Sequence, residues 1–282
     1  MDFILPLTAA FLQGSSSLLD KVVLSVRRMD YRAYVGASFP IIFLVYAGIV
    51  LLQHQSIDIG LFAGPLLTVL LASIAINICS NALYYRALQH DHLTELQTID
   101  VISRLPIIFL VSYLFADERN WAIIAAALVS AIALIWAHYD HHHFHIQRRT
   151  LVYLIWVIFG VPWAAVFSKI LLYAWSPAPL EMIRNGGMAL VFGFLYFRQE
   201  ERISKRAFWL LVLLNTLSAL AWLFYFTSYQ QVGVVYTMLF YSLQPLLVYF
   251  GAVLFLKERF ERRKFVAFCV VLGSIVAVQL LT

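Results

Sequence analysis

Charged residues are scarce in this sequence of 282 residues. Asp, Glu, Lys and Arg make up 12% of the chain, whereas hydrophobic residues make up 62%. A soluble globular domain carries about 25% charged residues, and a single core could not bury so much apolar side chain. Apolar runs of about 20 residues, the length that crosses a bilayer, recur from end to end. The composition excludes an ordinary water-soluble protein and predicts an all-α polytopic membrane protein.

Cysteine is also rare, and its pattern favours neither a disulfide nor a metal site. The two cysteines, Cys79 and Cys269, each lie inside an apolar run, so we expect buried free thiols. Histidine is concentrated instead in "HYDHHHFHIQRR" (138–149), which holds five of the eight histidines. Imidazole clusters bind zinc or nickel, but a lone tract on a connecting loop usually lacks the geometry of a defined site. We therefore expect no cofactor and no functional metal.

A nucleic-acid-binding signature is absent, although the net charge is +5. The basic residues cluster in short loops between apolar runs, as membrane orientation requires. The first apolar run begins at Phe3 without a positively charged leader, so we expect a spanning helix there and not a cleavable signal peptide. The partners that the composition favours are the lipid bilayer and a small-molecule solute, and no nucleic acid.

The apolar runs predict ten spans, each of which must be a helix because unpaired backbone groups are costly in hydrocarbon. Pro40, Pro106, Pro162 and Pro245 lie inside spans and should kink their helices. The expected spans are 3–25, 33–53, 64–87, 95–116, 120–138, 151–173, 179–197, 207–228, 232–256 and 264–281.

The distribution of basic residues predicts the orientation of these spans. Odd-numbered loops and their edges hold 15 Lys and Arg residues, whereas the even-numbered loops hold only Arg119. Because loops rich in Lys and Arg stay in the cytoplasm, we expect a multi-pass protein of the plasma (inner) membrane with both termini outside.

Two segments of the chain repeat one pattern. "SRLPIIFLVSYLFADER" (103–119) and "SLQPLLVYFGAVLFLKER" (242–259) both begin Ser-x-x-Pro and end Glu-Arg, and they occupy corresponding spans, the fourth and the ninth. Since five is an odd number, a second five-span unit enters the membrane from the opposite side. We therefore predict two inverted five-helix repeats, 1–139 and 150–282, joined by the His-rich loop 140–149, a symmetry typical of secondary transporters.

These segments, with "GSSSLLDK" (14–21), "NALYYRAL" (81–88) and "FSKILLYAWSPAPLEMIRNGG" (167–187), resemble the drug/metabolite transporter superfamily in its ten-helix EamA-type form. The resemblance covers essentially the whole chain and implies an inverted-repeat transporter fold. It also implies that spans one, three, four, six, eight and nine border a central cavity. Family members are generally described with cytoplasmic termini, whereas the charges of this chain favour the reverse.

Some charged residues lie inside the expected spans, where they usually pair or face a polar cavity. Asp100 and Arg104, at i and i+4, either form a mutual salt bridge or leave Arg104 to contact a solute. Glu181 and Arg184 form either an interfacial, snorkelling pair or part of the site. Protonation of Asp100 or Glu181 would offer a route to proton coupling, which no sequence feature demands. Candidate ion-pair or coupling residues are Asp20, Lys21, Glu181 and Arg184.

Polar and aromatic residues recur at helical spacing in several spans. Asn77, Asn81 and Tyr85 lie on one stripe of span three, and such stripes either line a cavity or join helices. Most aromatic residues are explained by interface belts, but Trp222 and Tyr225 fall in the repeat equivalent of "NALYYRAL". The predicted solute-binding residues are Asn77, Asn81, Tyr85, Asp100, Arg104, Lys169, Trp222, Tyr225, Tyr241 and Gln244.

The sequence favours a secondary transporter that moves a small organic solute by alternating access around a central polar cavity. A lipid flippase or a non-transporting membrane scaffold is the alternative. An intramembrane enzyme would need a paired catalytic constellation, and the neighbouring Ser168 and Lys169 point to different sides of a helix. No catalytic residue is therefore assigned. Substrate, direction, coupling ion and oligomeric state leave no signature in the sequence.

Overall fold

The computed structural model confirms an all-α polytopic membrane fold. It describes residues 3–27, 31–57, 62–88, 99–138, 148–197, 205–255 and 260–281, and among these there is no β-strand. Within these described ranges, six helical stretches are long and apolar enough to cross a membrane, and shorter apolar helices accompany them.

Each predicted span corresponds to one helix or to two consecutive helical pieces. Seven are single: α1 (Ile4–Arg27), α2 (Tyr31–Leu52), α3 (Gly64–Leu88), α6 (Trp121–His138), α9 (Pro177–Phe197), α10 (Lys205–Val232) and α13 (Arg262–Leu281). Three are divided: span four into the helical residues 99–102 and α5 (Arg104–Leu114), span six into α7 (Arg148–Phe159) and α8 (Val161–Leu172), and span nine into α11 (Val234–Tyr241) and α12 (Gln244–Phe255).

Proline explains where the three divided spans break. Pro106, Pro162 and Pro245 each lie within three residues of a break, because proline has no N–H and its ring clashes with the carbonyl four residues earlier. The predicted kinks at these positions are thus breaks in the helix, whereas α2 continues through Pro40 without interruption.

The serines of the two Ser-x-x-Pro segments act alike at these breaks. The Ser103 hydroxyl donates a hydrogen bond to the carbonyl of Asp100 at 2.5 Å, and the Ser242 hydroxyl donates to the carbonyl of Leu239. Each serine therefore binds the carbonyl three residues earlier, where the helix loses its regular pattern. The repeated motif therefore produces the same local backbone structure, a helix break, in both halves.

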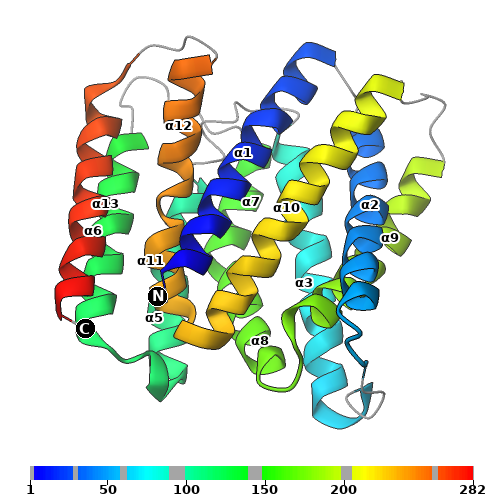
Figure 1. Cartoon of the computed structure of the whole chain (residues 1–282), viewed down its shortest axis with the longest axis horizontal. Helices are drawn as coiled ribbons and strands as arrows, with labels where there is room; N and C mark the ends of the chain where they lie inside the picture. The colour runs from blue at the N-terminus through cyan, green and yellow to red at the C-terminus, as the bar shows by residue number, and fades with distance from the viewer. Residues whose placement is uncertain are drawn as a thin grey trace.

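The helices pack as two inverted five-helix units would require. Helix α2 lies beside α9 and α6 lies beside α13, each pair running in opposite directions (Figure 1). Helix α1 packs along α10, and the equivalent contact of the other half joins α3 to α7 and α8. Exchanging spans one to five with spans six to ten therefore reproduces the same neighbours. The unit boundaries, 1–139 and 150–282, stay a prediction.

The two ends of the chain lie at the same edge of the helix bundle (Figure 1), which we call the terminal edge. The loop between α5 and α6, the loop between α8 and α9, and the junction of α10 and α11 are also at the terminal edge. Helices α10 and α13 begin at the opposite edge, which we call the loop edge (Figure 1).

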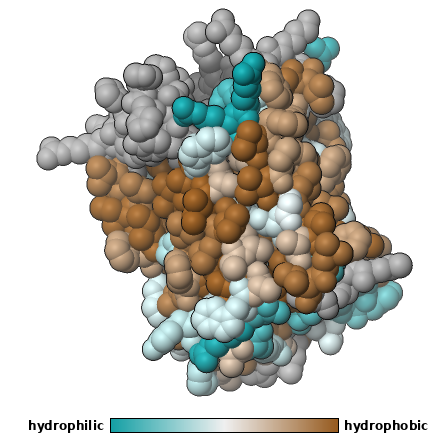
Figure 2. All heavy atoms as spheres, turned by 90° about the vertical axis from the view of Figure 1, so that its left-hand side faces the viewer, coloured by the Kyte–Doolittle hydropathy of each residue, from teal (hydrophilic) through white to brown (hydrophobic). Residues whose placement is uncertain are grey.

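The outer surface has the polarity of a membrane protein. Figure 2 shows a broad apolar band between hydrophilic residues at the two edges. The prediction that the cysteines are buried is wrong, because Cys79 and Cys269 are free but exposed. Lipid makes an outward-facing thiol compatible with an apolar run, so hydrophobicity alone does not report burial in this class of protein.

Candidate functional site

Arg104 is buried among aromatic rings near the break in span four. The residue is 9% exposed, and within the described part of the chain its Nη1 atom has no hydrogen-bond partner. Its Cζ atom lies 5.9 Å from the centre of the Tyr241 ring. Tyr225, Tyr229 and the Asp100 carboxylate are also near enough to act electrostatically on the guanidinium. A buried cation that lacks a hydrogen-bond acceptor is costly, so this site can receive a ligand atom.

The rings around Arg104 come from α10 and α11, and we call Trp222, Tyr225, Tyr229 and Tyr241 the aromatic cluster. The Tyr225 ring centre lies 4.5 Å from that of Tyr229 and 4.6 Å from that of Tyr241. The hydroxyls of Tyr225 and Tyr229 are hydrogen-bonded at 2.6 Å. Trp222 packs edge-on to Tyr225 at 5.1 Å. The structure therefore brings together Arg104 and three aromatic residues that the sequence selected, and it adds Tyr229.

Asp100 does not form the mutual salt bridge with Arg104 that the spacing allowed. In the part of the chain that the structure describes, no ion pair within 4.0 Å joins the two side chains, and Asp100 Oδ1 accepts a hydrogen bond from the Tyr153 hydroxyl. The Tyr153 ring packs against Tyr84 at 5.8 Å. Because Tyr153 on α7 binds the carboxylate, the guanidinium one turn away remains open to another acceptor.

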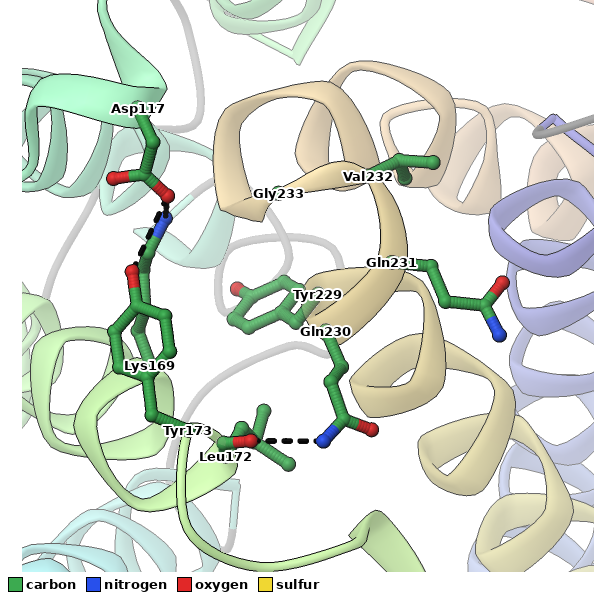
Figure 3. Close-up of a pocket in the computed structure, with 9 residues that line it drawn as sticks. All are labelled: Asp117, Lys169, Leu172, Tyr173, Tyr229, Gln230, Gln231, Val232 and Gly233. Atoms are coloured by element: carbon green, nitrogen blue, oxygen red, sulfur yellow. Dashed lines mark hydrogen bonds and ion pairs between the residues drawn. The ribbon is translucent and has the colours of Figure 1, made fainter.

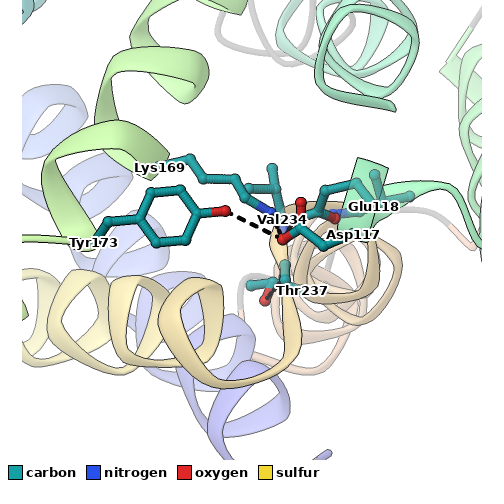
Figure 4. A network of polar contacts seen from close by, with 8 residues as sticks. Asp117, Glu118, Lys169, Tyr173, Val234 and Thr237 are labelled. Atoms are coloured by element: carbon teal, nitrogen blue, oxygen red, sulfur yellow. Dashed lines mark hydrogen bonds and ion pairs between the residues drawn. The ribbon is translucent and has the colours of Figure 1, made fainter. Parts of the chain in front are cut away.

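Lys169 is the centre of a second polar group, at the terminal edge (Figure 4). Its ammonium donates to Asp117 Oδ2 at 2.6 Å and to Glu118 Oε1. Lys169 and Glu118 are buried, whereas the Asp117 side chain is 58% exposed. The prediction that Lys169 binds solute is not tested by these contacts, but they show that two protein carboxylates already neutralise its charge.

Glu118 also joins the loop of the first half to a helix of the second half. Its Oε1 accepts the backbone N–H of Val234 at 2.7 Å, and its Oε2 accepts that of Val235 at 3.0 Å. A carboxylate is favourable there because the first turn of a helix has unpaired N–H groups and a positive dipole end. We call Asp117, Glu118, Lys169 and the first turn of α11 the terminal-edge tie.

Gly233 makes this close approach possible. Its φ of +94° lies in the region that favours glycine, and a Cβ atom placed there would be 2.9 Å from Glu118 Oε1. A side chain at position 233 would therefore both strain the backbone and displace the carboxylate that caps α11.

The rest of the Ala-Asp-Glu-Arg-Asn loop has a structural role. The Arg119 side chain donates to the carbonyls of Ser112 at 3.0 Å and Tyr113 at 2.7 Å, which end α5. Asn120 Oδ1 accepts the N–H groups of Ala122 and Ile123 and caps α6. The loop is thereby fixed between two helices, and Glu118 is held in position.

A pocket of about 270 Å³ opens beside the terminal-edge tie (Figure 3). Tyr229 of the aromatic cluster lines it, so its lining leads from Lys169 to the rings that surround Arg104. Partial burial raises the pKa of the Asp117 carboxyl, but the hydrogen bond and the positive charge of Lys169 outweigh this effect and hold the pKa below its ordinary value. The lining residues are Asp117, Lys169, Leu172, Tyr173, Tyr229, Gln230, Gln231, Val232 and Gly233.

Glu181 and Arg184 form a buried ion pair on α9, with Arg184 Nη1 2.9 Å from Glu181 Oε1. Arg184 is 2% exposed and also donates to Ser168 Oγ at 3.0 Å, and Asn185 donates to the Glu181 carboxylate. The snorkelling alternative is therefore wrong: the pair faces the protein because α8 supplies a polar partner. The Ser168 hydroxyl itself donates to Ala164, so it is committed to structural bonds.

The asparagine stripe of α3 is tied mainly to its own helix. Asn77 donates to the Ser73 carbonyl and Asn81 to the Asn77 carbonyl, both at 2.9 Å. Tyr85 packs against Tyr34 of α2 with ring centres 5.7 Å apart. The Tyr85–Tyr34 contact joins α3 to α2, whereas the asparagine bonds are internal to α3, and none of these contacts places the stripe beside Arg104.

Three further predicted residues are not joined to the aromatic cluster by any described contact. Gln244 begins α12, and its backbone lies near Gly14 of α1. The side chains of Asp20 and Lys21 lie outside the described residues. Most of the His-rich loop also lies outside them, and among the described residues there is no group of three potential metal ligands.

Sequence reasoning missed four residues of these groups: Asp117, Glu118, Tyr153 and Tyr229. The Glu-Arg motif after span four was a signal for the tie, because the end of span four and the end of span six lie at the same edge of the bundle. Tyr229 follows Tyr225 by four residues and shares its helix face, which periodicity could have indicated. Nothing in the sequence pairs Tyr153 with Asp100, because that contact joins separate spans.

Comparisons with known proteins agree with this architecture. Residues 149–280 match the model of the EamA-like transporter family. A solved crystal structure matches 99% of this chain and 96% of its own chain, with 14% sequence identity. The TM-score of 0.78 shows that the two proteins share a fold. No curated protein sequence matches. The resemblance to the EamA-type family is thus confirmed and indicates a membrane transporter of the drug/metabolite transporter type.

Proposed function

We propose that this protein, whose second half matches the EamA-like transporter family, is a secondary transporter that moves a small organic solute across the plasma membrane by alternating access. The solute would bind at Arg104 and the aromatic cluster, between the two halves. The charge distribution supports an orientation with the terminal edge outside and the loop edge in the cytoplasm.

The terminal-edge tie is the observation that carries this proposal. A transporter needs a mouth that closes, and Glu118 of the first half contacts both Lys169 and the first turn of α11 in the second half. The tie adjoins the pocket on the terminal edge, and Tyr229 leads from that pocket to the buried Arg104 group. Breaking the Lys169–Glu118 contact would leave Glu118 bound to the first turn of α11 without a neutralising cation, which would weaken the closure and favour opening of this route.

The breaks in spans four and nine supply positions at which such a movement can occur. Each break lies next to a solute-site residue: Ser103 precedes Arg104, and Ser242 follows Tyr241. Local backbone changes at a few positions are the usual way in which helices and domains reorient. An opening movement about these breaks would alter the aromatic cluster and the tie together.

Accessibility of a single cysteine tests this proposal without knowledge of the solute. In a background with Cys79→Ser and Cys269→Ser, Tyr241→Cys is reacted with a membrane-impermeant maleimide in vesicles of each orientation. With the tie intact, labelling from the terminal edge should be slow. Lys169→Met should accelerate it by at least about tenfold, because losing a buried partner shifts the population toward the open mouth.

Lys264→Met is the matched control. Lys264 forms an ion pair with Glu261 at the far end of the bundle, with 2.9 Å between Nζ and Oε1. This variant should leave the labelling rate unchanged. Equal rates in the Lys169→Met protein and its parent would contradict closure by the tie. Rapid labelling from both sides in the parent would indicate an open channel and contradict alternating access.

A further inference from the structure

We infer that the Arg104 site takes a small carboxylate-bearing solute, an organic monoanion whose flat body packs against the aromatic cluster. This inference rests on the proposed transport function. It adds the charge and chemical class of the solute, which the amino-acid composition does not indicate.

Among the described residues, the buried and half-buried carboxylates Glu118, Glu181 and Asp100 already have donors. Glu118 accepts from Lys169 and two backbone N–H groups, and Glu181 accepts from Arg184 and Asn185. Asp100 accepts from Tyr153. A cationic solute would have to displace these donors from a buried acid, which would leave a protein donor without a partner.

The buried guanidinium of Arg104 is in a different position, because no ion pair is formed by it within the described residues; Arg184 also has one nitrogen, Nε, without a partner, but it is paired with Glu181. The Arg104 Nη1 has no hydrogen-bond partner among the described residues, although the side chain is 9% exposed. A guanidinium presents N–H donors in a planar fork that matches a carboxylate, and such charge-assisted pairs are strong. The Asp100 carboxylate acts on Arg104 electrostatically but is hydrogen-bonded to Tyr153, so an anionic solute would add both acceptor atoms and a negative charge in direct contact with the guanidinium.

The surroundings indicate what the rest of the solute must be. The rings of Tyr225, Tyr229 and Tyr241 pack together next to Arg104, whose Cζ lies 5.9 Å from the centre of the Tyr241 ring, and Trp222 packs against Tyr225. Flat apolar groups stack on such rings in offset or edge-on arrangements. The rings lie in contact with one another in this structure, so a solute would enter by replacing ring-to-ring contacts when the terminal-edge tie opens.

Binding of three probes of the same size separates the possible charge classes. Benzoate, benzamide and benzylammonium are compared by thermal shift on the purified, full-length protein in detergent, since a ligand of the folded state raises its apparent melting temperature. Benzoate should stabilise the protein, and the neutral and cationic probes should stabilise it much less. Arg104→Gln should weaken benzoate binding by roughly 10- to 100-fold, the loss expected for one charge-assisted hydrogen bond.

Arg86→Gln is the matched control because Arg86 is an exposed arginine at the end of α3. It should bind benzoate as the parent does. Stronger stabilisation by benzylammonium or benzamide, or no stabilisation by benzoate, would overturn the inferred class. So would an Arg104→Gln protein that binds benzoate normally.

A further thermal-shift measurement, with phosphatidylglycerol as the probe, distinguishes a small solute from a lipid headgroup as the anion that binds Arg104. If phosphatidylglycerol stabilises the protein through Arg104 and benzoate does not, the small-solute class is overturned and the flippase alternative gains support. Failure of these binding tests would leave the cysteine-labelling result intact, because that measurement uses no added solute. The substrate class and the transport function can thus fail separately.

Discussion

The two Ser-x-x-Pro segments break their helices in the same way but place different side chains at the break. Ser103 and Ser242 each bond to the carbonyl three residues earlier, and each is followed three residues later by proline. The residue after the serine differs: it is Arg104 in the first half and Leu243 in the second, and both are buried. The two halves thus share the backbone break, but only the first half has a charged side chain beside it.

This difference teaches where to look for function in a protein built from inverted repeats. Equivalent positions that share residues, such as the two serines and prolines, maintain the common architecture. Positions at which one half carries a charge and the other a leucine are free of that constraint. The solute site is therefore expected at the asymmetric position, next to the symmetric break.

The largest effect is expected at the Glu-Arg end of the first segment, where Lys169 binds Glu118. Lys169→Met leaves Glu118 buried beside α11 without its cation, which should cost about 3–5 kcal/mol of stability. Lys264→Met removes a partner of the half-exposed Glu261 and should cost less than about 1 kcal/mol. Chemical denaturation of both variants in micelles measures the contrast, and equal losses would show that the tie contributes no more than an interfacial pair.

Making the second break resemble the first should be the next most damaging change. Leu243→Arg buries a guanidinium with no acceptor provided for it, at a cost of about 2.5–3.5 kcal/mol for a charge inside a span. The reciprocal change, Arg104→Leu, removes an unsatisfied buried donor, so it should preserve stability while abolishing benzoate binding. Melting temperature and probe binding are recorded for both proteins. A stable Leu243→Arg protein would argue against the asymmetry of the two breaks.

The serines test whether the two breaks are energetically equivalent. Ser103→Ala and Ser242→Ala each remove one hydrogen bond to a carbonyl, so each should cost about 1 kcal/mol. Their losses of unfolding free energy should agree within about 0.5 kcal/mol, and they should add in the double variant because the sites are separate. A large effect at Ser103 alone would mean that this serine supports Arg104 and not merely the backbone.

The smallest effect concerns the pH dependence of the tie. Lys169 depresses the pKa of Asp117 in the folded protein, so the resulting stabilisation is present above the unfolded pKa, about 4, and disappears as pH falls through the lower folded value. Because the Asp117 side chain is 58% exposed, the effect should stay below about 1 kcal/mol. Asp117→Asn should flatten the melting-temperature profile between roughly pH 5 and pH 3; a profile identical to that of the parent would contradict the pairing.

The fold could be predicted from sequence because its determinants are local. Apolar runs set the spans, proline set the breaks in spans four, six and nine, and the repeated motif indicated the inverted halves. Burial was less predictable: lipid surrounds the bundle, so the apolar surroundings of Cys79 did not mean that it was buried.

Which candidate residues lie together was predictable where a motif or helical spacing marked them and not where separate spans meet; their role in binding solute stays a prediction. Trp222, Tyr225 and Tyr241 were selected with Arg104, and the structure gathers them. The acceptor of Lys169 was not identified, because Glu118 reaches it only through the packing of α5, α8 and α11. Pairwise contacts between distant segments leave no periodic signal in a single sequence.

The distance across the mouth at the terminal edge tests the central claim most directly. Spin labels at Trp121→Cys on α6 and Gln231→Cys on α10, in the background with Cys79→Ser and Cys269→Ser, report this distance by double electron–electron resonance in nanodiscs. We expect one short distance in the protein with an intact tie and a second, longer population in the Lys169→Met protein. A single distance distribution, unchanged by Lys169→Met, would contradict the claim that Lys169 and Glu118 close this mouth.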